Sequence, residues 1–305
     1  MSTLECILVA MDLSAPARHA AERAFRVAAR TGFELHILHV QELDALDSLR
    51  DLLGAYLPTA KEAVAEEARE RLRQLAADPA RHRGVAAKTR VVSGVPLPVI
   101  ASEADALDAR LLVLGARGES FLQHAMLGST ASRLLRKSVR WPVLVVKQPP
   151  REDYSNVLVA VDFSPASQLA IREARRWAPG ADLVLLHAFE LPYEGKLAFA
   201  GVDEQVVRQY ITAGIEARRI RLHEVAANAG LRSGDYLVRV IHGDAPRQII
   251  AMEQEYDVDL IVMGKHGTHI VEELFLGSVT KHVLADAQGD VLVVADPRPG
   301  VGGLP

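Results

Sequence analysis

The 305-residue sequence has little cysteine and few aromatic residues. Cys6 is its only cysteine, and phenylalanine, tryptophan and tyrosine together make up 5% of the chain. A single cysteine excludes a disulfide bond within the chain and is typical of proteins from reducing compartments. We therefore expect the protein to be cytoplasmic. Because Cys6 lies inside an apolar run, we expect it to be a small core residue.

Long apolar segments and an excess of positive charge are missing as well. No stretch approaches the roughly 18 apolar residues of a membrane-spanning helix, and residues 1–5 lack the basic start of a signal peptide. The formal net charge is −4, which gives no general attraction for polyanions. We therefore expect no membrane and no nucleic acid among the partners.

The motifs of several common catalytic sites are also absent. There is no Gly-x4-Gly-Lys-Ser/Thr loop and no Gly-x-Ser-x-Gly elbow. His36 and His39 would point to opposite faces of a strand, so they could not share a metal ion. Because neither a positioned general base nor a carboxylate cluster is evident, we expect no catalytic residues, no metal-binding residues and no efficient enzyme.

What the sequence does contain is a glycine pattern that occurs twice. In both copies Gly-x-x-Gly is followed, after nine residues, by Gly-Ser. The two copies are Gly115, Gly118, Gly128 and Ser129, and Gly264, Gly267, Gly277 and Ser278. Each follows an apolar run and precedes a segment with helical spacing. Such a loop can bind phosphate, because the bare backbone approaches closely and the N–H groups of the first helical turn are free. A purely structural turn is the alternative.

Other segments repeat at nearly the same distance. Residues 10–14 (Ala-Met-Asp-Leu-Ser) recur at 160–164 (Ala-Val-Asp-Phe-Ser), and the run 143–146 recurs at 291–294. The chain is therefore predicted to be a tandem duplication of a domain of about 150 residues, a common domain size. We place the domains at 1–150 and 151–305, with the boundary in the proline and charge cluster 148–153.

Within each half, apolar strands alternate with helices. We expect Ser14 and Ser164 to cap the first helix of each half, and Gly32 to end the first of these helices. The expected strands are 6–10, 35–40, 88–92, 111–114 and 143–147, then 157–161, 183–188, 237–241, 260–263 and 291–294. Nearly continuous apolar strands separated by helices predict an α/β protein of two doubly wound domains, each with a parallel sheet flanked by helices.

Ligands of such sheets bind beyond the carboxyl ends of the strands, where the winding direction reverses. Asp12 and Asp162 end the first strand of each half, and Val40 and Ala188 end the second. A carboxylate would be repelled by phosphates, so we expect the two aspartates to accept hydrogen bonds from adenine or ribose. Their structural alternative is to cap the following helix.

These motifs together resemble the universal stress protein family, and in particular its tandem, ATP-binding branch. The resemblance covers about residues 3–147 and 155–295. It implies a five-stranded, Rossmann-like sheet of order 3-2-1-4-5 in each domain. It also implies an adenine nucleotide, ATP with or without magnesium, as the ligand, and a regulatory or stress-protective role.

The resemblance assigns nucleotide-binding residues in both halves. In the first half they are Asp12, Val40, Gly115, Arg117, Gly118, Gly128, Ser129 and Thr130, and in the second Asp162, Ala188, Gly264, Lys265, Gly267, Gly277, Ser278 and Val279. Some positions depart from the family pattern. Ala188 replaces the usual valine, and Gly289-Asp290 stands where a proline is usual. Arg117 and Lys265 replace small polar residues, and we expect them either to pair with phosphates or to be solvated surface charges.

The histidines near these motifs are expected to have structural roles. His39 and His187 should be satisfied core residues, and His124 and His266 exposed loop residues, although the latter two could reach a phosphate.

The resemblance also bears on association. In the family the last strand pairs across a two-fold axis, so we expect the two halves to pair through their last strands within one chain. A homodimer of whole chains and an unidentified protein partner fit the same scheme. Three functions stay open: an ATP-binding regulatory protein, a slow ATPase, and a nucleotide-free interaction scaffold.

Overall fold

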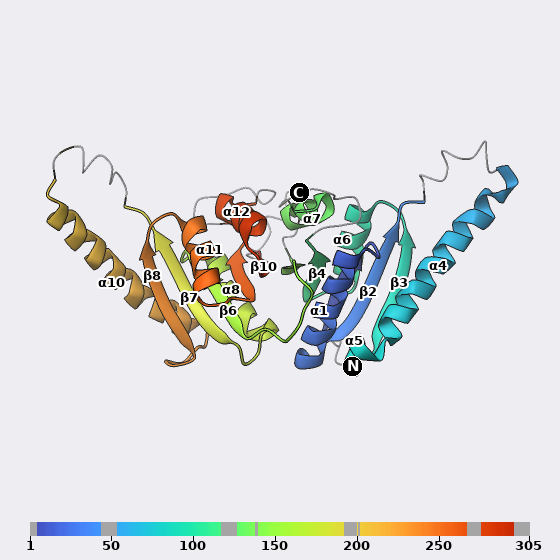
Figure 1. Ribbon diagram of the computed structural model, residues 1–305, viewed down its shortest axis with the longest axis horizontal. Coiled ribbons are helices and arrows are strands. Elements are labelled where there is room, and N and C mark those ends of the chain that lie inside the picture. Colours follow the sequence, from blue (N-terminus) through green and yellow to red (C-terminus); the bar gives the residue numbers. More distant parts are fainter. Residues whose placement is uncertain are drawn as a thin grey trace, which may run out of the picture. The chain divides into compact units, whose positions relative to one another are not determined.

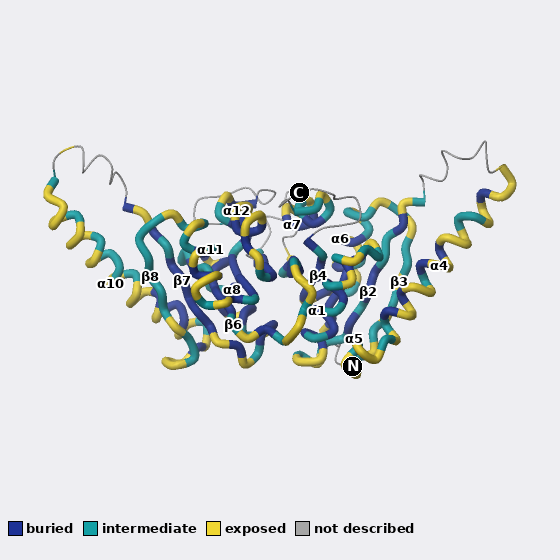
Figure 2. Tube along the Cα trace, in the orientation of Figure 1, coloured by how far each residue is buried: buried dark blue, intermediate teal, exposed yellow. Residues whose placement is uncertain are grey.

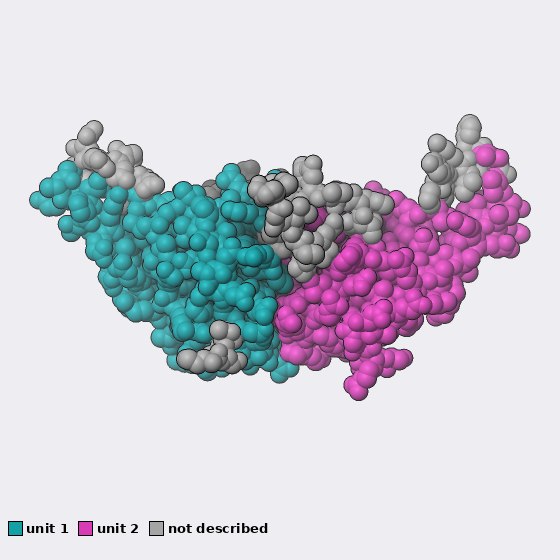
Figure 3. Space-filling view, turned by 180° about the vertical axis from the view of Figure 1, so that it is seen from behind, with its two compact units in different colours: residues 1–153 teal, residues 154–305 magenta. Residues whose placement is uncertain are grey.

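The computed structural model describes residues 5–43, 54–116, 127–137, 140–191, 200, 202–266 and 276–295. The chain divides into two compact units, residues 1–153 and residues 154–305 (Figure 3). We refer to them as the first and the second unit. The division falls at the end of the proline and charge cluster 148–153.

The first unit contains five parallel strands (Figure 1). Their order is β3-β2-β1-β4-β5, as predicted. The strands are β1 (Cys6–Met11), β2 (Glu34–Gln41), β3 (Ala87–Ser93), β4 (Leu111–Gly115) and β5 (Val143–Val146). The winding direction reverses between β1 and β4, so the predicted site lies where the loops after these two strands meet.

Helices cover both faces of these strands, because the crossovers from β1 to β2 and β3 run in one direction along the sheet and those from β3 to β4 and β5 run in the other, each of them right-handed. The α-helices are α1 (Ala15–Thr31), α4 (Leu57–Ala77), α5 (Pro79–His82), α6 (Pro96–Ala106) and α7 (Ser129–Lys137), and η1 (Gly54–Tyr56) is a 3-10 turn. Helix α1 packs on β1 and β4, whereas α6 packs on β2 and on α7. The Ser14 hydroxyl caps α1 by accepting from Ala17 N at 3.3 Å, and Gly32 ends it with a φ of 74°, so both predicted caps are confirmed.

The second unit repeats this plan, with strand order β8-β7-β6-β9-β10. Its strands are β6 (Asn156–Ala160), β7 (Asp182–Phe189), β8 (Tyr236–His242), β9 (Leu260–Gly264) and β10 (Asp290–Val294). Its helices are α8 (Pro165–Trp177), α10 (Glu204–Asn228), α11 (Ala245–Glu255) and α12 (Ser278–Asp286). The Ser164 hydroxyl caps α8 by accepting from Ser167 N at 3.2 Å, as predicted.

The central strands form the core of each unit (Figure 2). Every residue of β1 is buried, Cys6 included, and Ile7 and Val9 are fully inaccessible. Burial of one such side chain stabilises the fold by about 1.5–3 kcal/mol. Because both faces are covered, the strands are apolar runs without alternation, which is the pattern that made them visible in the sequence. Among the helices of the described residues, none has the length and apolar content needed to cross a bilayer.

The second unit enters its last strand without the proline usual in the family. Here the Glu253 carboxylate accepts hydrogen bonds from the N–H groups of Gln288, at 2.9 Å, and Gly289, at 2.7 Å. A side chain at Gly289 would place its Cβ 3.0 Å from Val258 O. The position that corresponds to Pro142 is Asp290, whose N–H donates to Asp259 O at 3.1 Å, a bond that a proline could not make.

Candidate functional site

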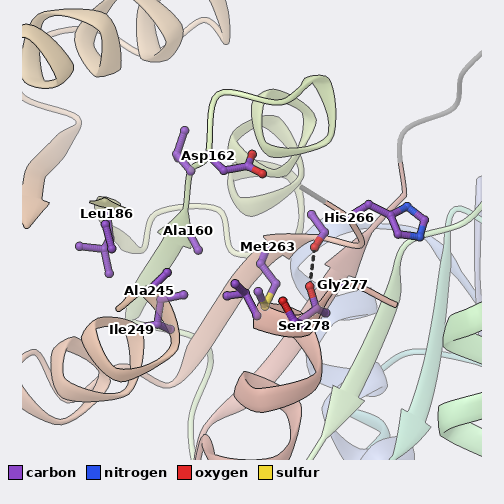
Figure 4. Close-up of a pocket in the computed structure, with 14 residues that line it drawn as sticks. Ala160, Asp162, Leu186, Ala245, Ile249, Met263, His266, Gly277 and Ser278 are labelled. Carbon is purple, nitrogen blue, oxygen red and sulfur yellow. Dashed lines mark hydrogen bonds between the residues drawn. The ribbon is translucent and has the colours of Figure 1, made fainter. Parts of the chain in front are cut away.

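The second unit has a cavity of about 380 Å³ at the carboxyl ends of its strands (Figure 4). Its walls come from the ends of β6, β7 and β9 and from the first turns of α11 and α12. The lining residues are Ala160, Val161, Asp162, Leu186, Ala188, Ala245, Ile249, Met263, Gly264, His266, Gly277, Ser278, Val279 and Thr280. This volume falls within the roughly 300–1,000 Å³ of small-molecule sites.

One side of the cavity is apolar. Leu186 from β7 and Ala245 and Ile249 from α11 lie together on this side (Figure 4). Ala188 also lines the cavity, and its small side chain takes up less room than the valine usual in the family. Such a wall suits a flat, largely apolar ring system, which gains about 25 cal/mol for each Å² of apolar surface that it buries.

The opposite side is formed by the start of α12. Helix geometry leaves the N–H groups of Ser278, Val279 and Thr280 without partners inside the helix, and no side chain caps α12 at Gly277. By contrast, Ser164 and Asp244 cap α8 and α11 with their side chains. An uncapped helix start carries partial positive charge, and it favours an anion by about 0.3–1 kcal/mol per interaction.

Two hydrogen bonds hold the start of α12 against the end of β9. Gly277 N donates to Lys265 O at 3.0 Å, and the Thr280 hydroxyl donates to Gly264 O at 3.0 Å. A Cβ at Gly277 would lie 3.2 Å from Lys265 O. Glycine at this position therefore permits the close approach that places the helix start in the cavity wall.

Asp162 lines the cavity and also has a structural role. Its Oδ1 accepts hydrogen bonds from Ser164 N at 3.0 Å and from the Ser164 hydroxyl at 2.5 Å. Asp12 accepts from Ser14 N at 3.1 Å in the first unit. The aspartates therefore do not cap the next helix themselves, as their structural alternative proposed; each closes a turn on the serine that does. Contact of either carboxylate with a ligand stays a prediction.

The first unit places its predicted residues in the same arrangement. Val40 lies near the end of β2 and Gly115 at the end of β4, while Gly128 precedes α7 and Ser129 and Thr130 begin it. Gly128 N donates to Ala116 O at 2.9 Å, which repeats the bond between Gly277 and Lys265. Arg117, Gly118 and His124 of the first unit, and Gly267 of the second, lie outside the described residues.

Lys265 differs from its expected surroundings. Its exposed fraction is 1%, so the expectation of a solvated surface charge is wrong. It directly follows β9, where Lys265 N donates to Val294 O at 2.7 Å and continues the pairing with β10. Lys265 is not among the residues that line the cavity, and its contact with a phosphate stays a prediction.

Each second strand carries a histidine that was predicted to be a satisfied core residue; His187 is one, whereas His39 is hydrogen-bonded but only partly buried. His187 is buried, and its Nδ1 lies 2.7 Å from Val161 O. His39 makes the equivalent contact, 2.8 Å from Met11 O. Burial lowers the pKa of His187 below its ordinary value, because the protein interior disfavours the charged ring. His266 lines the cavity, but its ring is turned away from the other labelled side chains (Figure 4).

Sequence reasoning missed the apolar wall of the cavity. Ala245 and Ile249 belong to α11, which follows the Gly243–Pro246 segment that repeats Gly94–Pro96. The repeated break located the start of this helix, but ordinary core residues do not reveal which of them line a cavity. Among the described residues, no three His, Cys, Asp or Glu side chains come close enough to hold a metal ion.

The fold and the cavity define a class of protein: tandem doubly wound α/β domains with a glycine-lined cavity at a topological switch point. The chain belongs to the universal stress protein family, whose model matches residues 4–147 and 153–295.

Individual relatives match along most of the chain. A universal stress protein of Mycolicibacterium smegmatis is 29% identical over 301 residues, which covers 94% of this chain and 96% of that protein. One of Mycobacterium tuberculosis is 28% identical over 260 residues, covering 81% of this chain and 77% of that protein. The crystal structure of a universal stress protein from Archaeoglobus fulgidus has a TM-score of 0.65 at 21% identity, covering 97% of this chain and 100% of that chain. The structural likeness supports the fold.

Proposed function

We propose that this protein binds an adenine nucleotide, ATP, and that the bound nucleotide changes a surface presented to a protein partner in a regulatory or stress-protective role. One observation carries the proposal: the cavity of the second unit has an apolar wall on one side and the uncapped start of α12 on the other. An adenine nucleotide has the same division between an apolar base and an anionic tail.

In this arrangement the base lies against Leu186 and Ile249, and the phosphates accept hydrogen bonds from the N–H groups of Ser278 and Val279. Asp162 accepts from the ribose hydroxyls or the adenine amino group. Magnesium bound with the nucleotide would take its ligands from phosphates and water, which is how this ion usually binds.

Nucleotide content and affinity test the proposal together. The purified protein is denatured and the released small molecules are separated by chromatography, and magnesium-ATP is titrated into nucleotide-free protein in a calorimeter. We expect released ATP or a binding isotherm with one or two sites per chain. Absence of both would reject nucleotide binding and favour the scaffold alternative.

Site-filling variants assign the binding to a unit. Ala188→Phe fills the cavity of the second unit, and Val40→Phe fills the equivalent position of the first. If both units bind, each variant loses one of two sites; if only the second binds, only Ala188→Phe abolishes the heat. Alanine at Gly264 is a poorer choice, because its Cβ would lie 3.0 Å from Ala166 Cβ and disturb the packing of α8.

Slow ATP hydrolysis is the second candidate function, since bound ATP is held near water without a dedicated base. Phosphate release is followed over hours for the unchanged protein and for the double variant Val40→Phe/Ala188→Phe, which fills both sites. A rate that the double variant does not lower assigns the hydrolysis to a contaminant and rejects the enzyme alternative.

Two further expectations belong to the same proposal. We place the protein in the cytoplasm, which its single buried cysteine supports. We also propose that the halves pair through β5 and β10, because apolar strands left at a sheet edge invite association. A charged substitution at Leu144 should then expand the molecule in solution scattering, and an unchanged profile would contradict the pairing.

A further inference from the structure

The first unit contains another cavity, of about 830 Å³, between α1, α4 and α5. Helices α1 and α4 lie on the other side of the β-strands from α6 and α7, so this cavity is separate from the glycine loop. Its floor is apolar and includes Met11, Leu13 and Leu75. Met11 and Leu75, 6% and 7% exposed, form the base of the cavity, and the partly exposed Leu13 offers apolar surface that an occupant could cover.

The rim of this cavity is basic. Arg18, Arg71 and Arg81 line it, and Asp78 is the one acidic lining residue. Arg71 pairs with Glu67, and Arg81 pairs with Asp78 and with Glu22, the latter at 2.7 Å. In the part of the chain that the structure describes, the exposed guanidinium of Arg18 makes no hydrogen bond or ion pair, so it is available to an anion.

The second unit shows how the same place can be filled. The segment Arg-Leu-x-x-Leu-Ala-Ala at 71–77 recurs as Arg-Leu-x-x-Val-Ala-Ala at 221–227, and Leu13 recurs as Phe163, in both cases 150 residues later. Leu13 and Phe163 share a φ of 64°, which confirms that they are structurally equivalent. The Arg221 guanidinium lies 4.3 Å from the centre of the Phe163 ring, so an aromatic ring and a cation pack on each other there.

The first unit lacks this contact between a cation and an aromatic ring, and it carries more positive charge at the equivalent positions. Leu13 has no ring for Arg71 to cover, which leaves the space open above Met11 and Leu75. At the position of Arg18 the second unit has Gln168, and at the position of Arg81 it has Leu231. An open apolar floor and two arginines that the second unit lacks at the equivalent positions therefore occur together in the first unit.

We propose that this cavity binds a small organic anion, one with an apolar body that covers Met11 and Leu75 and a carboxylate or phosphate head that pairs with Arg18. None of the lining residues is among the predicted nucleotide-binding residues, and the occupant sits against the turn after β1 that also carries Asp12.

The fluorescent dye 1-anilinonaphthalene-8-sulfonate is a suitable probe, because it combines an apolar body with an anionic group. It is titrated into the full-length chain, with and without magnesium-ATP. Two variants introduce residues of the second unit: Arg18→Gln removes the cation, and Leu13→Phe fills the cavity. We expect each to weaken dye binding about fivefold to tenfold, the range for loss of one charge-assisted hydrogen bond or of the apolar pocket.

Arg30→Gln is the matched control, because it removes the same charge from the same helix at a residue that does not line the cavity. Arg18 is exposed, so its variant should fold, and circular dichroism verifies this; if Leu13→Phe does not fold, Arg18→Gln alone decides. Three results would overturn the proposal: Arg18→Gln leaves dye affinity unchanged, Arg30→Gln weakens it as much as Arg18→Gln does, or magnesium-ATP displaces the dye by competition.

Displacement of the dye identifies the anionic head. Octanoate, octyl phosphate and neutral octanol share one apolar chain and differ in the group that would meet Arg18. The proposal is supported if either anion displaces the dye at a concentration at least about fivefold lower than octanol requires. The anion that displaces it at the lower concentration identifies the preferred head group. Equal displacement by octanol would show an apolar pocket without anion recognition and would reject it.

Discussion

The Glu253 carboxylate accepts a hydrogen bond from the backbone N–H of Gly289 at 2.7 Å, and from that of Gln288 at 2.9 Å. Glu253 is 4% exposed and lies on α11, whereas Gln288 and Gly289 form the turn that leads into β10. One buried side chain thus joins a helix that lines the cavity of the second unit to the last strand of that unit. In the first unit, Trp141 and Pro142 enter β5, and the Trp141 indole N–H donates to Asp105 at 3.0 Å.

Loss of this carboxylate should destabilise the second unit. Glu253→Ala would leave two N–H donors of a tight turn without their acceptor. Each donor that water does not reach lowers the free energy of unfolding by about 1–3 kcal/mol. We expect the free energy of unfolding, measured by urea denaturation, to fall by at least about 2 kcal/mol. Glu255→Ala, on the same helix at an exposed position, is the control and should change it by less than about 0.5 kcal/mol.

Gly289 should tolerate no side chain. In Gly289→Ala the new Cβ would lie 3.0 Å from Val258 O and 3.1 Å from Asp259 O, two backbone atoms that cannot rotate away. We expect a loss of about 1–3 kcal/mol in stability. Gly214→Ala on α10 provides a contrast, because the nearest atom there belongs to the flexible Arg218 side chain and alanine favours a helix. Equal effects of the two substitutions would contradict this explanation.

The central strands were accessible to prediction because they are buried on both faces, whereas β3 and β8 are only partly buried. Their apolar runs located β6 at 157–161, one residue from the observed Asn156–Ala160. Helix α5 was not predicted, since four residues capped by Asp78 are too short for a helical pattern. The glycine spacing located the start of α12, but it did not reveal that Lys265 is buried. Burial of a charged side chain depends on contacts between segments far apart in the chain, here β9 and β10.

Acid should destabilise the second unit through His187. Its pKa lies below the ordinary value of 6.5 in the folded state, because burial disfavours the charged ring, whereas the unfolded ring recovers the ordinary value. The unfolded state therefore binds more protons as the pH falls below about 6.5, and stability present above that pH is lost. The slope can reach about 1.4 kcal/mol per pH unit for one proton.

Urea denaturation at pH 7.5 and pH 5.5 tests this dependence. His187→Gln should lower stability at pH 7.5, since the contact with Val161 O is altered, but should show a smaller loss on acidification than the unchanged protein. His36, whose pKa burial also lowers, leaves part of the slope in place. An identical slope in the variant would show that His187 does not titrate in this range.

The two proposed nucleotide sites should differ in affinity because the second strand of each unit ends in a different residue. Val40 in the first unit corresponds to Ala188 in the second, which lines the cavity with two fewer methyl groups. At about 0.8 kcal/mol for each buried carbon group, the difference approaches 1.6 kcal/mol, or about tenfold in Kd. Ala188→Val should therefore tighten nucleotide binding in the second unit by up to about tenfold, and Val40→Ala should weaken it in the first by a similar factor.

Calorimetric titration of magnesium-ATP into each variant measures both changes, and the double substitution provides the internal check. Exchanging the two residues should interchange the affinities of the sites and leave the sum of their binding free energies nearly unchanged, because Val40 and Ala188 lie in different compact units. Weaker binding by Ala188→Val would show instead that the base already fills the space beside Ala188, so that the added methyl groups collide with it. The sign of this one change thus reports how closely the apolar wall of Leu186 and Ile249 fits its ligand.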